Sequence, residues 1–293
     1  MPEFTIPVDL RNPGQVFACL GLMEAAETLL KTSCEGQFDY LGRESNTTFT
    51  LFAGCGRNPI EAVVDFLATC RVFSIAPRES DELTTARWGV PTTRLSGHAF
   101  PAPAPKTPAT LPAILEADGR RLVLDHWIDG AHSGRDNVKF WAGAGGYPGA
   151  ALARDALVLI AELTRVERDA ARTNPFTLSK PMTSSFRLDW RRDYIPLDAG
   201  FSPNVTGVKM VGYPLTELLA ALGLQNARPA RLRDKLSYRY GVSSARLPVT
   251  FTRGILGAAE IGFPMRTFHM SLGWPGQEGQ ARCIVDAFEE NVS

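Results

Sequence analysis

Residues 12–31 read NPGQVFACLGLMEAAETLLK and predict an amphipathic helix that begins at the proline. Asn12 can cap the helix, and Pro13 suits its first turn because the N–H that a proline lacks would be unpaired there anyway. Apolar residues then recur at helical spacing, and Lys31 suits the negative end of the helix dipole. The spacing therefore predicts a helix over 14–31.

The segments on either side of this helix alternate between strand-like and helix-like patterns. Asn58 and Pro59 repeat the cap-and-proline signal and start a second amphipathic run. In chain order, the pattern predicts a strand over 4–10, the first helix, strands over 38–40 and 47–52, a helix over 60–70 and a strand over 72–75. This β-α-β-β-α-β order resembles a ferredoxin-like or RNA-recognition arrangement.

The rest of the chain mixes the same two kinds of element. Prolines crowd residues 99–112 and predict an extended surface loop. Further helices are predicted over about 150–170 and over 214–224, and strands over 121–127, 185–190, 236–240, 247–251 and 267–272. We expect residues 1–293 to form a single α+β domain with antiparallel sheets and packed helices.

A short internal echo links the two halves of the chain. Residues 18–22 read ACLGL and residues 220–224 read AALGL, and both end an apolar helix that follows a proline. Two such short matches do not establish a duplication.

The composition is that of a soluble globular protein, with 44% apolar and 21% charged residues in 293. The formal net charge is zero, which excludes binding of nucleic acid through a field of the whole molecule, so that any basic surface must be local. The five cysteines are widely spaced and form no metal-binding motif. We expect a cytoplasmic protein without a metal or cofactor, because reduced thiols fit that compartment and neither a signal peptide nor a membrane-spanning run is visible.

The segment 127–149 reads WIDGAHSGRDNVKFWAGAGGYPG and places a lysine and a tryptophan beside a group of glycines. Backbone N–H groups that glycines leave accessible at a helix N-terminus can seat an anion. Lys139 and the indole of Trp141 suit a phosphate attached to a base. The segment lacks the GK[ST] ending of a P-loop and the GxGxxG spacing. An equal alternative is a plain turn that leads into the following helix.

A second cluster reads RLDWRRD over 187–193. On a continuing strand, Arg187 and Arg191 would share one face with Asp189. Arg191 and Arg192 could then hold phosphates. The alternative is an ion-pair network in which Asp193 and Asp198 pair with these arginines and brace a turn at 202–204.

The clearest local basic patch covers 228–246, where six cations stand against one acid. Arg231, Arg233 and Arg239 are interleaved there with Tyr238 and Tyr240. Basic and aromatic residues interleaved on a strand suit a nucleic-acid backbone with stacked bases. The alternative is an ordinary solvated face.

Catalytic patterns are sparse in this sequence. The four histidines, His98, His126, His132 and His269, share no metal-binding spacing, and GxSxG, HExxH and DxD motifs are absent. We therefore expect no catalytic residue, although an enzyme stays an alternative.

Several segments, in order along nearly the whole chain, resemble an accessory-protein family of type I-G (formerly I-U) CRISPR systems, in the Csb/Csx class. The segments that carry the resemblance are DLRNPGQVFACLGLMEAA (9–26), LDHW (124–127), KFWAG (139–143), LDAGFSPN (197–204) and YPLTELLAALGLQ (213–225). The first and fourth are the most specific. The family has a less glycine-rich stretch after its WAG, so no role is carried over to the glycines of 143–149.

The resemblance implies a subunit of an antiviral, RNA-guided defence system against foreign DNA, with a RAMP-like variant of the α+β fold. Such a subunit is a non-catalytic part of the effector complex, or an accessory of the helicase-nuclease, and contacts guide RNA or target DNA and other effector subunits. The nucleic-acid contacts that we expect are Lys139, Trp141, Arg187, Arg191, Arg192, Arg231, Arg233 and Arg239.

Two alternatives stay open at this point. One is a CRISPR RNA-processing endoribonuclease or other nuclease, in which His126 and His132 act as general acid and base and Lys139 stabilises developing charge. The other is a pure scaffold whose surfaces meet protein alone.

Overall fold

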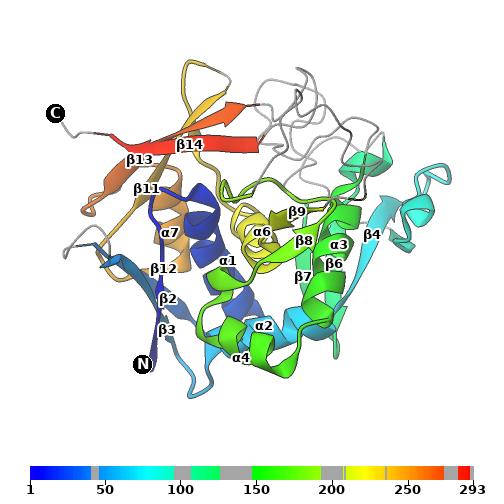
Figure 1. Cartoon of the computed structure of the whole chain (residues 1–293), viewed down its shortest axis with the longest axis horizontal. Coiled ribbons are helices and arrows are strands. Elements are labelled where there is room, and N and C mark those ends of the chain that lie inside the picture. Colours follow the sequence, from blue (N-terminus) through cyan, green and yellow to red (C-terminus); the bar gives the residue numbers. More distant parts are fainter. Residues whose placement is uncertain are drawn as a thin grey trace.

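Helix α1 (Pro13–Leu30) lies at the centre of the fold, with sheets and helices on all sides of it (Figure 1). The computed structural model describes residues 1–40, 46–95, 107–125, 147–192, 207, 209–234, 236–273 and 283–290. The side chain of Asn12 caps α1 by accepting the N–H of Gln15, as predicted. Nearly every residue of α1 is buried, which is typical of a helix in a core rather than at a surface.

The described strands form three four-stranded sheets and one two-stranded ladder. The first sheet has the order β1-β3-β2-β12, the second β10-β11-β13-β14 and the third β5-β4-β6-β7, in which only β4 and β5 run parallel. The strands are β1 (Glu3–Pro7), β2 (Cys34–Asp39), β3 (Thr48–Ala53), β4 (Arg71–Pro77), β5 (Thr92–Leu95), β6 (Ala113–Ala117), β7 (Arg120–Leu124), β8 (Lys180–Met182), β9 (Met210–Gly212), β10 (Ala230–Arg231), β11 (Ser237–Val242), β12 (Leu247–Pro248), β13 (Arg266–Gly273) and β14 (Cys283–Glu289).

The helices pack between these sheets and share one hydrophobic core with them. Besides α1 they are α2 (Pro59–Thr69), α3 (Gly149–Ala161), α4 (Arg165–Thr173), α6 (Pro214–Gly223) and α7 (Val249–Leu256). α1 contacts α6, α2, α7, β2 and β7, so it joins elements from all three four-stranded sheets or their covering helices. The chain thus has an α+β fold with antiparallel and mixed sheets and packed helices, as predicted.

The tightest helix packing in the core is the crossing of α1 and α6. A Cβ added at Gly21 would lie 1.8 Å from the carbonyl oxygen of Leu219, and one added at Gly223 would lie 2.0 Å from that of Phe17. Each glycine therefore lets the backbone of the other helix approach where no side chain could fit. The two glycines are those of the ACLGL and AALGL segments. The two similar segments therefore contact each other where α1 crosses α6.

The β-α-β-β-α-β order predicted for the first 75 residues is confirmed, but the ferredoxin-like sheet that it resembles is wrong. Its strands do form, but β4 lies in the third sheet, beside β5 and β6, whereas β1, β2 and β3 belong to the first. The fourth place in the first sheet is taken by β12, far along the chain. The pattern of apolar residues predicted each element, but it does not specify which strand pairs with which.

Three of the predicted elements also differ from the structure. The helix expected over 150–170 is interrupted after α3, because Thr164 and Glu167 form a capping box that starts α4. The strand expected over 247–251 ends after two residues, because Pro248 has no N–H for the ladder and lies at the start of α7. Residues 185–190 form no strand.

Most of the proline-rich segment predicted as a loop, residues 99–106, lies outside the described residues. Its described end carries the short 3-10 helix Pro108–Thr110. The sequence pattern did not predict strands β5, β6, β8, β9, β10 and β14. One hydrophobic core joins most of the described elements, which is compatible with a single domain. That residues 1–293 form one domain stays a prediction.

Gly21→Ala is expected to lower the free energy of unfolding by about 3 kcal/mol or more, because the new methyl group would overlap the backbone of α6. Urea unfolding, followed by circular dichroism, measures the change. Gly56→Ala is the matched control, since a Cβ there meets nothing within 4 Å. Equal stabilities for the two variants would contradict the close crossing.

Candidate nucleic-acid interface

In the second sheet (β10-β11-β13-β14), the tyrosines of β11 face the core and the arginine between them faces outward. On β11, Tyr238 and Tyr240 are 3% and 0% exposed, whereas Arg239 between them reaches the outer face. Tyr240 donates its hydroxyl hydrogen to the carbonyl oxygen of Leu10 over 2.7 Å and stacks on Phe268 inside the core. The interpretation of Tyr238 and Tyr240 as groups on which bases stack is therefore wrong, because both tyrosines belong to the core.

The aromatic groups of the outer face come from β13 and β14 instead. Arg239 lies opposite His269 in the register of β11 and β13, and His269 lies opposite Phe288 in the register of β13 and β14. The rings of His269 and Phe288 are stacked, with centroids 4.8 Å apart and an angle of 10° between the planes. We call these three residues the cross-strand row. Phe288 is 48% exposed, which is unusual for an aromatic side chain with a stacking partner.

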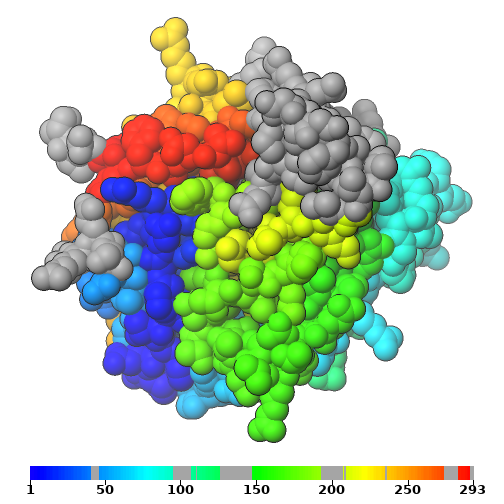
Figure 2. Space-filling view, in the orientation of Figure 1, coloured from blue at the N-terminus to red at the C-terminus, as the bar shows by residue number. Residues whose placement is uncertain are grey.

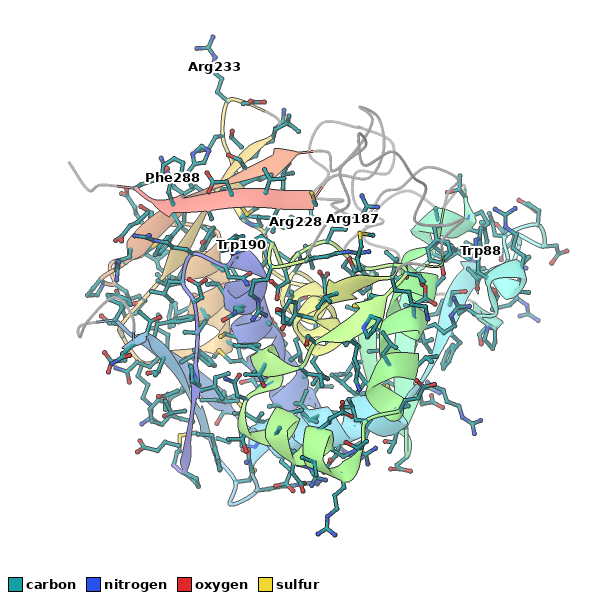
Figure 3. The ribbon with its side chains drawn as sticks, in the orientation of Figure 1. Trp88, Arg187, Trp190, Arg228, Arg233 and Phe288 are labelled. Atoms are coloured by element: carbon teal, nitrogen blue, oxygen red, sulfur yellow. The ribbon has the colours of Figure 1, made fainter. Side chains whose placement is uncertain are left out.

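Two more of the predicted arginines lie at the edge of this sheet. Arg231 and Arg233 are exposed on the hairpin that joins β10 to β11, and Figure 3 shows Arg233 at its tip, pointing away from the rest of the molecule. The turn is held by hydrogen bonds from Leu232 N to Ser237 O and from Leu236 N to the carboxylate of Asp234. In the register of β10 and β11, Arg231 lies opposite Tyr238, so it is on the other face of the sheet from Arg239, although it is exposed on the edge strand. Arg233 lies beyond the end of β10, in the turn.

The acids at the end of β14 are neutralised by arginines. Arg239 forms an ion pair with Glu290 at 2.6 Å, and Arg266 donates two hydrogen bonds to Glu289, one of 2.6 Å. The hydrogen bonds from Arg266 hold the pKa of Glu289 below its usual range. These pairs reduce the repulsion that the two carboxylates would exert on an anion near the cross-strand row.

The other predicted arginines lie in the segment 185–192, which crosses the start of α1. Arg191 makes hydrogen bonds to both carboxylate oxygens of Asp189, donates to Phe176 O over 3.0 Å and lies 3.7 Å above the ring of Tyr213. Arg192 is only 4% exposed and contacts the hydroxyl of Ser185. Both arginines are thus engaged within the protein, with Asp189 as the acid, whereas the acids Asp193 and Asp198 of the second interpretation lie outside the described residues.

Arg187 is the one arginine of this segment that lies beside the second sheet. Its backbone has φ of 64°, in the left-handed region, which turns the chain out of an extended path. Its carbonyl oxygen accepts the N–H of Ile284 over 3.3 Å, at the start of β14. Figure 3 shows Arg187 and Arg228 near this end of β14, and Phe288 near the other.

Two buried carboxylates hold the segment in place. Glu217, on the first turn of α6, accepts the backbone N–H groups of Leu188 (3.1 Å) and Asp189 (3.2 Å), which explains why no strand forms there. Asp189 accepts a hydrogen bond from the side chain of Asn12 at 2.8 Å. The two acids thereby connect the N-termini of α1 and α6 through one stretch of backbone.

The environment of Glu217 disfavours its charged form. Burial is the main cause, and it raises the pKa from 4.5 to about 7. The nearby charge of Asp189 raises the pKa further, whereas the N–H groups that Glu217 accepts and the charge of Arg192 lower it. The carboxyl group therefore titrates near neutral pH.

A cavity of about 390 Å³ lies beside Arg191, between the end of β1 and residues 174–177. Its polar groups are occupied by the protein itself: Gln15 accepts the N–H of Asp9, and Arg191 is held by Asp189. We therefore place the candidate site on the outer face of the second sheet rather than in this cavity.

Several of the predicted site residues lie outside the described residues. They are Lys139 and Trp141 with most of the glycine-rich segment, the histidines His98, His126 and His132, and the LDAGFSPN segment. In the part of the chain that the structure describes, no group of three or more His, Cys, Asp or Glu residues could hold a metal ion. None of the described helices is both long enough and apolar enough to span a membrane.

Sequence reasoning missed Phe288 and treated His269 as structural. His269 lies within the predicted strand 267–272. Because β14 was not predicted, the sequence pattern gave no reason to expect the ring of Phe288 beside His269. The alternation of Phe288 with Ala287 and Glu289 is the only signal, and it is too short to specify a strand.

Comparison with protein-family models, with curated proteins and with solved structures finds no match for this chain.

Glu217→Gln is expected to change how stability depends on pH. Because the pKa of Glu217 is higher in the folded state, this carboxyl group favours folding at acid pH, and that contribution is lost as pH rises from about 4.5 to about 7. Relative to the variant, the wild-type chain should lose on the order of 2 kcal/mol between about pH 5 and about pH 8. Urea unfolding of both proteins at the two pH values measures this.

The difference between the proteins, rather than either curve alone, isolates Glu217 from other titrating groups. A constant difference across this pH range would show that Glu217 is ionised in the fold at all these values, contrary to its buried setting.

Proposed function

We propose that this chain is a non-catalytic, nucleic-acid-binding subunit of a type I-G CRISPR effector complex or of its helicase-nuclease. The sequence resemblance supports the system, and the outer face of the second sheet supports the activity. The single observation that carries the activity is the set of arginines around this sheet: Arg239 in the cross-strand row, Arg233 on the hairpin, Arg187 at the start of β14, and Arg231 on the edge strand, on the other face.

The chemistry of this face suits binding of a phosphate backbone. Guanidinium groups donate several hydrogen bonds in a fixed plane and match phosphate oxygens. The chain as a whole is neutral, so such a local surface would direct nucleic acid to one side of the molecule. In RNA-guided complexes base pairing reads the sequence, and the protein subunits hold the backbone, which requires no catalytic residue.

Arg191 and Arg192 have a different role in this proposal. Both are engaged within the protein, so they position the segment that carries Arg187 rather than contact phosphate. Lys139 and Trp141 remain predicted contacts.

The double variant Arg231→Glu/Arg233→Glu should bind RNA or DNA more weakly, because two phosphate contacts become repulsive. We expect the affinity to fall at least about tenfold at low salt, and the dependence of affinity on salt to become shallower by about two ion equivalents. Fluorescence anisotropy of labelled oligonucleotides across a salt series measures both.

The matched control is Arg57→Glu/Arg165→Glu, which makes the same change in net charge at two exposed arginines. These lie just before α2 and at the start of α4, on the side of the molecule opposite the hairpin (Figure 1). Equal effects of the two double variants would refute a local binding surface.

Co-purification with the other effector subunits, before and after nuclease treatment, tests the assembly. Loss of the complex after nuclease treatment is the expected result. A complex that persists without nucleic acid, from a chain that binds no oligonucleotide, would support the scaffold alternative instead.

A further inference from the structure

We infer that the cross-strand row is a stacking platform for an unpaired base of single-stranded RNA or DNA, and that the base lies on the free face of Phe288. This inference rests on the proposed function and specifies the ligand of the same face.

The geometry of Phe288 leaves one ring face available. His269 covers the other face at 4.8 Å, with the rings nearly parallel, so the phenyl ring stands in a fixed orientation across the sheet. β14 is the last strand in the order β10-β11-β13-β14, and no described strand pairs with its outer edge. A planar group that approaches from this edge would extend an existing stack from His269 and Phe288 by one more ring.

β14 lies at the surface of the molecule, where a ligand can reach Phe288. In Figure 2, β14 (red) lies at the surface of the face shown, beside the N-terminal residues (blue). Phe288 is 48% exposed and Val285, on the same strand, is 49% exposed. Val285 packs over Gly273, where an added Cβ would lie 3.0 Å from its Cγ1, and the exposed Asp286 lies between Val285 and Phe288 on this strand.

The charges around the row suit a nucleotide rather than an apolar peptide. Arg239 follows directly after His269 in the row, so a cation, an imidazole and a phenyl ring lie in line across three strands. Arg233 on the hairpin and Arg187 at the start of β14 provide further cations toward one end of the sheet, where Leu272 is hydrogen-bonded to Leu236 and Ile284 to Arg187. Stacking surfaces with flanking cations are the usual means by which proteins hold single strands.

A duplex would not use this platform. Its bases are stacked on one another and their faces are closed, whereas an antiparallel sheet with exposed rings accepts bases that are splayed out of a single strand. The arginines can contact the backbone of either form. Two contributions to affinity are therefore distinct. The arginines contribute a part that depends on salt, and Phe288 contributes a part that depends on whether the nucleic acid is single-stranded.

Phe288→Ala tests the stacking role. We expect it to weaken binding of single-stranded oligouridine or oligothymidine about tenfold, to leave binding of a duplex unchanged, and to leave the salt dependence unchanged. Phe288→Tyr keeps the ring and should bind as the wild-type chain does. Comparison of the two oligonucleotides shows whether the platform serves RNA or DNA.

Phe251→Ala is the control. Phe251 is 46% exposed, nearly as much as Phe288, but it lies on α7, which packs against β11 from the core side. It removes the same ring from a surface outside the row and should have no effect. Thermal unfolding of all variants confirms that they fold.

The outcomes separate this inference from the proposed function. If the wild-type chain binds no nucleic acid, both fail. If it binds with a steep salt dependence and Phe288→Ala does not change the affinity, or lowers duplex affinity equally, only the stacking platform is refuted. If Phe288→Ala leaves oligonucleotide binding intact but abolishes co-purification with effector subunits, the face docks protein and the platform is likewise refuted.

Discussion

The close crossing of α1 and α6 is the constraint on which the other parts of this fold depend. Gly21 and Gly223 let the two backbones approach to distances that any side chain would prevent. Because of this contact, the N-termini of the two helices lie near each other, and Asn12 and Glu217 can both reach the segment 185–192. A wider crossing would separate these groups and leave buried polar atoms without partners, which is costly.

The binding face follows from the same arrangement. Tyr240 of the second sheet packs against Phe17 of α1 and donates a hydrogen bond to Leu10, just before that helix. The start of β14 is tied to Arg187, in the segment that Glu217 holds. With its inner face fixed to the central helix, the sheet presents Arg239, His269 and Phe288 to the outside. The buried network is thus structural, and the exposed row is where a ligand can be bound.

Local signals in the sequence predicted much of this fold. The Asn-Pro pairs specified the starts of α1 and α2, because capping and a fixed proline φ act within a few residues. Long-range pairing was not predictable in the same way. Nothing near β2 indicates that its partner is β12, and nothing near residues 185–190 indicates that their N–H groups are taken by Glu217. Such contacts depend on residues far apart in the chain.

The same limit applies to the candidate site. The basic character of 228–246 was visible, but the register of β10 and β11 sets Arg239 on the outer face and Arg231, opposite Tyr238, on the other. The direction of the tyrosines was misjudged, because alternation predicts two faces but not which of them is buried. Phe288 lies beside His269 only because β13 pairs with β14. The residues between these two strands lie outside the described part of the chain, and no local pattern predicted the pairing.

The central claim is that single strands contact the outer face of the second sheet. Ultraviolet crosslinking of the wild-type chain to oligouridine, followed by mass spectrometry of the adducts, tests it without any substitution. The account predicts adducts at Phe288 and His269, with weaker ones on the hairpin that carries Arg233. Adducts confined to the side of α2 and α4, with none on β13 or β14, would contradict it.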